Sequence, residues 1–368
     1  MINKRWIRRI DLPLVFASLG ILIISLITIS SATHVTEVTG KSFWFVQRQA
    51  LFAVLNIGLI VFLMNFDYKS LLPYGKKLYI FNLIMLLTVM FVGHSALGAQ
   101  RWIQIGPVTL QPSEFSKIIL IVSLAALLED RIGKINTLID ILPLAGFIGL
   151  PFLLVLKQPD LGTSLVFIAI FLGMIFACGI NLKLLGGLFG VALACMPVMW
   201  FFLKDYQKKR IEVFLDPNVD PLGSGYHIIQ SKIAIGSGQL FGKGLFEGTQ
   251  SQLNFLPENH TDFIFAVVGE EMGFIGAAFL LILYLIILWR GMKIAQEASD
   301  SFGMLLAVGI TSMLAFHILV NVGMTTGIMP VTGIPLPLMS YGVSALTTNM
   351  MAIALLLNIH LKKQRLLF

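Results

Sequence analysis

Ten apolar runs of membrane-spanning length divide this 368-residue sequence. A helix needs about 20 mostly apolar residues to cross the hydrocarbon core of a bilayer. Only 12% of the residues are charged and 57% are hydrophobic, whereas about a quarter of a soluble domain is charged. The sequence therefore predicts an all-α polytopic membrane protein, with residues 1–368 forming a single integral membrane domain. The predicted spans are residues 12–31, 45–64, 77–93, 113–129, 139–157, 162–180, 183–203, 263–289, 303–326 and 341–361.

Basic residues flank these runs unevenly. They gather before the first span, at Lys4, Arg5, Arg8 and Arg9, and after the last, at Lys362 and Lys363. Short cytoplasmic loops of membrane proteins carry an excess of Lys and Arg. We therefore expect both termini in the cytoplasm and the long segment 204–262 on the outer face. The net charge of +7 is explained by these flanking clusters, so no nucleic-acid partner is predicted.

The longest polar stretch of the chain is residues 204–262, which is too long to be a plain connector. Its pattern predicts a helix over 205–215, a turn cluster at 216–223 and a short amphipathic helix over 226–235. A glycine-rich loop follows at 236–248. Long loops that carry Asp, Glu, His and Lys between apolar segments are common places for functional residues.

Asp262 stands where this polar stretch meets the eighth apolar run. Burial at that boundary would raise its pKa, and a carboxylate in such a place can act as a general base. The alternative is that Asp262 caps the following helix. Glu270 and Glu271 lie further along the same run, where structural helix contacts are the simpler interpretation.

Three other ionisable residues lie in or beside apolar runs. Glu114 and Lys117 are three residues apart at the start of the fourth span, within reach of each other on one helix face. Such residues usually face a cavity, although a purely structural ion pair is the alternative. Asp160 follows Gln158-Pro159, and its alternative role is to cap the sixth span.

Residues 327–342 contain several prolines and glycines and no charge. Proline breaks helices, and broken backbone at membrane depth is tolerated only when it is buried in protein or lines a cavity. We therefore expect Pro330, Thr332, Pro335, Pro337 and Ser340 to shape a cavity wall.

The sequence gives little support for a protein-held metal. His260-Thr-Asp262 is too short to specify a zinc site, and Cys178 and Cys195 both lie in apolar runs, which predicts buried free thiols. No metal ligand is assigned, and a divalent cation (Mg²⁺ or Mn²⁺) is left open as a cofactor.

Six motifs occur in a characteristic order and together resemble the shape, elongation, division and sporulation family nearly end to end. They are Gly98-Ala-Gln-Arg-Trp-Ile, Gln111-Pro-Ser-Glu, Gln158-Pro-Asp-Leu-Gly-Thr-Ser, Asp220-Pro-Leu-Gly-Ser-Gly-Tyr, Leu256-Pro-Glu-Asn-His-Thr-Asp-Phe-Ile-Phe-Ala and Pro330-Val-Thr-Gly-Ile-Pro-Leu-Pro. The text from His227 to Gly238 is most similar to the elongation, or rod-shape, member rather than the division member. Val343 is a departure, because the family usually has glycine there.

The resemblance implies ten spans and a peptidoglycan glycosyltransferase that polymerises lipid II and releases undecaprenyl diphosphate. Carried over by motif, the essential outer-face aspartate is Asp262, the cavity ion pair is Glu114 with Lys117, and the other motif acid is Asp160. Arg101, Lys243 and Ser340 complete the expected substrate cavity. The implied partners are a class B penicillin-binding protein and the elongation machinery with its MreB-associated proteins, in the bacterial cytoplasmic (inner) membrane.

Two other functions remain open at this stage. A lipid II flippase fits the intramembrane polar groups and broken helices, but it predicts an inverted repeat and a charged central pathway, which the sequence does not display. A non-catalytic scaffold for a penicillin-binding protein would not require Asp262.

Overall fold

The computed structural model describes residues 10–34, 43–96, 99–106, 108–221 and 223–363. The N-terminal basic cluster and Gly98 lie outside these residues. Each predicted apolar run contains a helix, which confirms the predicted helix positions. The helices are α2 (Leu12–Ala32), α3 (Trp44–Asn65), α4 (Gly75–Val92), α5 (Pro112–Leu128), α6 (Leu138–Lys157), α7 (Leu161–Ala177), α8 (Leu182–Phe202), α12 (Ile264–Gln296), α13 (Ser301–Thr326) and α14 (Val343–Lys363).

The described residues form a multi-pass helical bundle. Seven of its helical segments are long and apolar enough to cross a membrane, by length and composition. α5 and α7 have only 17 residues each, so the count of ten crossings stays a prediction. Cys178 is buried as expected, but Cys195 on α8 is exposed, so that part of the prediction is wrong.

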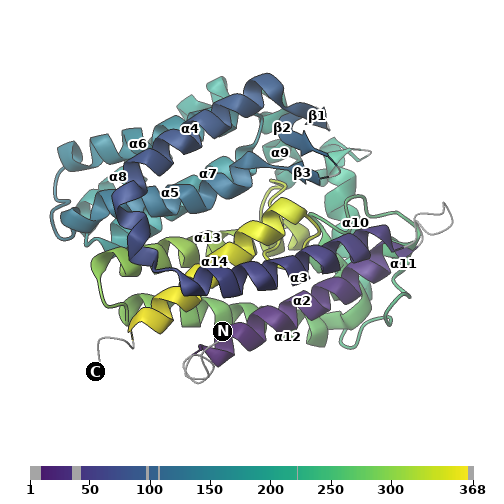
Figure 1. The fold of residues 1–368 in the computed structure, drawn as a ribbon. Coiled ribbons are helices and arrows are strands. Elements are labelled where there is room, and N and C mark those ends of the chain that lie inside the picture. The colour runs from purple at the N-terminus through teal and green to yellow at the C-terminus, as the bar shows by residue number, and fades with distance from the viewer. Residues whose placement is uncertain (1–9, 35–42, 97–98, 107, 222, 364–368) are drawn as a thin grey trace.

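α13 and α14 form the centre of the bundle (Figure 1). α13 packs against α5, α7 and α12, and α14 packs against α3 and α5. Most of the apolar stretch of each is buried inside the protein, 72% for α13 and 78% for α14. A helix that is apolar all round belongs in such a position. The central helices therefore bring α3, α5, α7 and α12 together around one end of the bundle.

The polar stretch between α8 and α12 forms helices of its own. They are α9 (Asp205–Leu215), the short 3₁₀ turn η4 (Pro217–Val219), α10 (Ser224–Ser237) and α11 (Thr249–Gln252). The predicted helix at 205–215 is confirmed, and the predicted amphipathic helix lies within α10. In Figure 1, these elements cover the end of the bundle opposite the start of α2 and the end of α14.

A small antiparallel sheet is the element that the sequence analysis missed. It comprises β1 (His94–Ala96), β2 (Ala99–Ile105) and β3 (Val108–Leu110), in the order β1-β2-β3. Ile103 pairs with Leu110 and Ile105 with Val108. The strands are too short to give a clear alternation, although Gly106-Pro107 is a turn signal. The sheet connects α4 to α5 and presents Arg101 and Trp102 at the same end as α9 and α10.

A glycine breaks α12 near its start. Gly273 has φ 65° and ψ −164°, a conformation that a residue with a side chain rarely adopts. The loop before α11 restores the hydrogen bonds, because the backbone N–H groups of Phe274 and Ile275 donate to the carbonyls of Gln239 and Leu240, at 2.8 and 3.1 Å. The glycine-rich loop is therefore packed against the break in α12 and hydrogen-bonded to it.

The segment between α13 and α14 is non-helical, as the sequence predicted. Side chains from three helices satisfy its carbonyls. Ser25 on α2 donates to Met339 at 2.6 Å, and Tyr284 on α12 donates to Pro337 at 2.7 Å. Asn321 on α13 donates to Ile334 at 2.8 Å. Broken backbone inside a membrane protein requires such partners, so segment 327–342 is held rigidly in place.

Candidate active site

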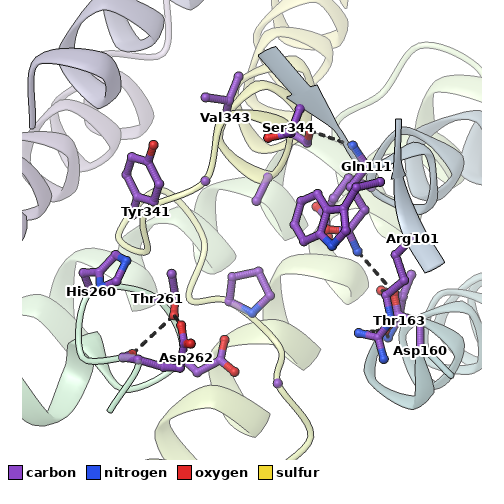
Figure 2. A pocket seen from close by; sticks show the side chains of 18 of the residues that line it. Arg101, Gln111, Asp160, Thr163, His260, Thr261, Asp262, Tyr341, Val343 and Ser344 are labelled. Atoms are coloured by element: carbon purple, nitrogen blue, oxygen red, sulfur yellow. Dashed lines mark hydrogen bonds and ion pairs between the residues drawn. The ribbon is translucent and has the colours of Figure 1, made fainter. Parts of the chain in front are cut away.

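A polar cavity of about 450 Å³ opens at the end of the bundle that carries the sheet and α9. It is lined from α3, β2, β3, α5, α7, α9, the turn before α12, segment 327–342 and the start of α14. Figure 2 shows His260, Thr261 and Asp262 on one side, and Arg101, Asp160 and Thr163 on the other. Its charged lining residues are three arginines and four acids: Arg48, Arg101, Arg210, Glu114, Asp160, Glu258 and Asp262.

The backbone around Asp262 is fixed by three successive carbonyls. The carbonyl of His260 accepts from the N–H of Tyr341 at 2.9 Å, and that of Thr261 accepts from the hydroxyl of Ser340 at 2.6 Å. The carbonyl of Asp262 accepts from the side-chain amide of Asn321 at 3.0 Å. Segments about 60 to 80 residues further along the chain therefore fix the backbone position of Asp262.

The carboxylate of Asp262, by contrast, accepts no hydrogen bond from any described residue. It also does not cap α12, whose N-cap is Phe263 without a side-chain bond, so the capping alternative is wrong. The side chain is partly exposed, and the cavity is what it faces. The pKa of Asp262 is raised to about 6, mainly because burial disfavours the charged form and the nearby charge of Glu258 adds to this effect, while Arg210 and Arg101 oppose it.

Glu258 and His260 flank Asp262 on the same turn. Glu258 has φ 52° and accepts a hydrogen bond from the Thr261 hydroxyl at 2.9 Å, which closes the turn. Burial lowers the pKa of His260, so its imidazole is neutral at pH 7. The ring packs against Phe45 and Tyr341, with centroids 4.9 and 5.8 Å away, and these two rings also contact each other. His260 is therefore a wall of the cavity rather than a charged group.

Asp160 connects three elements around the cavity. Its carboxylate caps α7 by accepting from the backbone N–H and the hydroxyl of Thr163, at 3.1 and 2.9 Å. It also accepts from Gln111 and Ser113 at the start of α5, at 3.2 and 3.3 Å. The guanidinium of Arg101 lies 3.8 Å away. The capping interpretation of Asp160 is confirmed, and the same carboxylate faces the cavity.

We expect two substitutions of Asp160 to separate its contributions. Asp160→Asn keeps a good N-cap but loses the charge beside Arg101, whereas Asp160→Ala loses both. Asp160→Ala should lower the free energy of unfolding by about 1 kcal/mol more than Asp160→Asn, a typical capping contribution. Thermal unfolding of both purified variants measures this difference. Equal stability of the two would show that the cap contributes nothing.

Arg101 binds the backbone that precedes α7. Its guanidinium donates to the carbonyl of Gln158 at 3.1 Å and also to the carbonyl of Pro159. These bonds hold β2 against the α6–α7 connection. The residue lines the cavity as expected, with its charge only partly neutralised by Asp160, because the two groups lie at the outer limit of ion-pair distance.

Glu114 and Lys117 form the predicted ion pair, with 2.7 Å between Nζ and Oε2. Both side chains are almost fully buried. Glu114 lines the cavity, whereas Lys117 lies behind it. The negative charge at the first turn of α5 is also favoured by the helix dipole.

Three residues expected in the substrate cavity do not line it, namely Lys117, Lys243 and Ser340. Lys243 pairs with the buried Glu270 at 2.9 Å and donates to the Thr249 hydroxyl at 2.7 Å. A buried carboxylate needs such partners, so Lys243 is used to hold the glycine-rich loop. Ser340 lies behind the wall, where it accepts from Leu336 N–H and donates to Thr261. Of the other wall residues expected from segment 327–342, Thr332 and Pro335 line the cavity, whereas Pro330 and Pro337 do not.

The sequence analysis did not assign Arg48, Glu258 or Tyr341 to the cavity, whereas Arg210 was among the outer-loop cations expected to stabilise the leaving diphosphate. Arg48 lies within the apolar run of α3, and an arginine in such a run is expensive, so it carried a usable signal. Its guanidinium lies 4.9 Å from the Trp44 ring centroid. Arg210 on α9 donates to the Thr332 carbonyl at 3.4 Å. Only the fold shows that α9 returns to this site.

Known proteins resemble the chain over nearly its whole length. The FtsW/RodA/SpoVE family model, described as "Cell cycle protein", matches residues 12–365. The peptidoglycan glycosyltransferase MrdB of Escherichia coli (strain K12) is 41% identical over 350 residues, 94% of each chain. Stage V sporulation protein E of Bacillus subtilis (strain 168) is 41% identical over 362 residues, 95% of this chain and 96% of that one.

Solved structures share the fold. One solved structure superposes on this chain with a TM-score of 0.81. It is described as showing the structural coordination of polymerization and crosslinking by a peptidoglycan synthase complex. It is 32% identical and covers 96% of this chain and 98% of its own. The rod shape determining protein RodA of Thermus thermophilus gives 0.70 at 30% identity, over 95% and 96%. The chain therefore belongs to the FtsW/RodA/SpoVE family, the shape, elongation, division and sporulation proteins that its motifs resemble.

Proposed function

We propose that this protein is a peptidoglycan glycosyltransferase that polymerises lipid II during lateral cell-wall elongation and rod-shape maintenance. The observation that carries the proposal is the position of the Asp262 carboxylate. It faces a polar cavity and accepts no hydrogen bond from the described residues. A general base must be free to reach the proton that it accepts.

In the proposed reaction, the 4-hydroxyl of the acceptor N-acetylglucosamine attacks the anomeric carbon of the donor strand's terminal N-acetylmuramic acid. The new C–O bond forms as the bond to the diphosphate breaks, and undecaprenyl diphosphate leaves. The hydroxyl proton goes to Asp262. No nucleotide takes part, since the donor already carries its leaving group.

The leaving diphosphate gains negative charge, which requires cations or hydrogen-bond donors nearby. Arg48, Arg101 and Arg210 line the same cavity as Asp262 and are the groups that we assign to this task. Arginine suits it because its planar guanidinium can bind phosphate oxygens through two parallel hydrogen bonds.

A divalent cation would fit this site only together with the substrate. No group of three or more His, Cys, Asp and Glu side chains converges in the described part of the chain. Mg²⁺ is often held by one or two carboxylates plus substrate phosphates, and Glu258 is the cavity carboxylate that we assign to such an ion. The bound cation would add positive charge beside the diphosphate.

The proposal places the cavity at the outer face of the bacterial cytoplasmic membrane, with both termini in the cytoplasm. That orientation follows the distribution of Lys and Arg. The partner that we propose is a class B penicillin-binding protein, supported by the likeness to a chain of a peptidoglycan synthase complex. MreB-associated elongation proteins complete the proposed assembly.

The direct test is glycan polymerisation from labelled lipid II by the purified protein with its cognate transpeptidase. We expect long glycan strands that a muramidase digests. Translocation of labelled lipid II across liposomes without polymer would favour the flippase, and the absence of both activities would favour the scaffold.

The pH dependence of polymerisation provides a second prediction. Asp262 acts as a base only when it is deprotonated, and burial raises its pKa to about 6. The rate constant kcat/KM should therefore fall about tenfold per pH unit as the pH decreases below that value. A profile that stays flat from about pH 5 to about pH 8 would contradict the assignment.

A further inference from the structure

His317 lies on α13 behind the cavity wall, and the proposed reaction does not use it. Its side chain is almost fully buried, at 1% exposure. Nε2 lies 2.9 Å from Nζ of Lys117, and Nδ1 lies 2.7 Å from the carbonyl oxygen of Met313. A buried histidine on an apolar helix is often only a packing residue, so the chemistry of its two partners decides what it does.

The two partners fix the protonation of the ring. A carbonyl oxygen only accepts hydrogen bonds, so Nδ1 carries the hydrogen and donates to Met313. An ammonium group only donates, so Nε2 presents its lone pair to Lys117. His317 is therefore a neutral imidazole in a single tautomer, and it acts as an acceptor for a buried cation.

Lys117 in turn has two acceptors, His317 and Glu114. The ammonium donates to Oε2 of Glu114 at 2.7 Å. The other carboxylate oxygen, Oε1, has no hydrogen-bond partner among the described residues and is not fully enclosed. Because Glu114 lines the cavity and is otherwise buried, Oε1 faces that cavity.

These contacts form one chain from the core of the bundle to the site: Met313 carbonyl, His317, Lys117, Glu114, cavity. The chain also crosses between helices, since His317 belongs to α13 and the ion pair to α5. A lysine side chain has many rotamers, and removing one of two acceptors would let the ammonium swing and draw Glu114 with it.

We propose that His317 is a positioning residue that, through Lys117, keeps Oε1 of Glu114 directed into the cavity as an acceptor for a substrate O–H or N–H group. The inference rests on the proposed function, because the substrate that supplies this group is the lipid-linked sugar. In this proposal Glu114 binds the substrate, and His317 orients the Glu114 side chain.

The test compares His317→Leu and His317→Gln in two backgrounds, wild type and Glu114→Gln. Leu removes the acceptor at similar volume, whereas the Gln side-chain oxygen reaches the position of Nε2. We expect His317→Leu to raise KM for lipid II about tenfold, as for the loss of one hydrogen bond to a charged group. kcat should change less, and His317→Gln should restore KM.

The decisive readout is the double-substitution cycle. If His317 acts through Glu114, His317→Leu adds no increase in KM once Glu114 is replaced by Gln, because coupled residues are not additive. An unchanged KM for His317→Leu in the wild-type background, or an equal increase in both backgrounds, would overturn the proposal. Activity of the wild-type protein tests the proposed function separately.

Thr311 provides a matched control on the same helix. It is buried, and among the described residues its hydroxyl donates to the carbonyl of Ala307 alone, at 2.7 Å. Thr311→Val should lower Tm without raising KM, which shows the effect of losing a buried polar group alone. If His317→Leu does not fold, His317→Asn replaces it, because its shorter side chain cannot reach Lys117.

Discussion

Replacing Asp262 with Asn is expected to lower the rate of glycan polymerisation by about 10²- to 10⁴-fold, the usual contribution of a general base. Asn keeps the size of the side chain but cannot accept the proton of the attacking hydroxyl. The backbone of the turn should stay in place, because its three carbonyl bonds do not involve the carboxylate. Labelled lipid II with the partner transpeptidase measures the loss.

Glu212→Gln is the matched control for this experiment. Glu212 is an exposed acid on α9, and it does not line the cavity. Its loss should leave polymerisation unchanged. Equal polymer from wild type and from a folded, partner-bound Asp262→Asn variant would exclude Asp262 as the base.

Replacing Lys117 with Met should lower the free energy of unfolding by about 3–5 kcal/mol, because it leaves the buried Glu114 without its counter-charge. Both side chains are almost fully buried, so water can reach the remaining carboxylate only through the cavity that Glu114 lines. The double variant Lys117→Met with Glu114→Gln should recover most of that stability, since no unpaired charge remains. Thermal unfolding in detergent measures all three proteins.

The comparison between these variants decides what the ion pair does. If Lys117→Met alone were as stable as wild type, Glu114 would have to be protonated or solvated through the cavity. If the double variant were as unstable as the single one, packing by the lysine side chain would explain the loss instead of charge.

The helices could be predicted from the sequence because burial in lipid imposes long apolar runs, and each run became a helix. The sheet at 94–110 could not, because its strands of three to seven residues are held by pairing rather than by hydropathy. Asp262 could be located by its place at a polar boundary. That its carboxylate accepts no hydrogen bond from the described residues could not be predicted, because Asp262 could equally have capped α12, whose N-cap is Phe263.

Distance along the chain explains the remaining errors. Lys243 resembles a phosphate ligand beside glycines, but Glu270 lies within reach only because α12 breaks at Gly273 and the loop folds against it. Arg48 and Arg210 reach the cavity from α3 and α9, which are far apart in sequence. For Asp160 the sequence offers capping and a cavity role as alternatives, and the structure shows that one carboxylate does both.

The contrast between Asp262 and Asp160 has a consequence for inhibitor chemistry. Asp160 is saturated by donors from α5 and α7, so a small molecule gains little by approaching it. Asp262 has a fixed backbone, and its carboxylate at the wall of an open cavity accepts no hydrogen bond from the described residues. A compound that carries an amidinium group would find a bidentate acceptor there, and it would compete with the hydroxyl that Asp262 must reach.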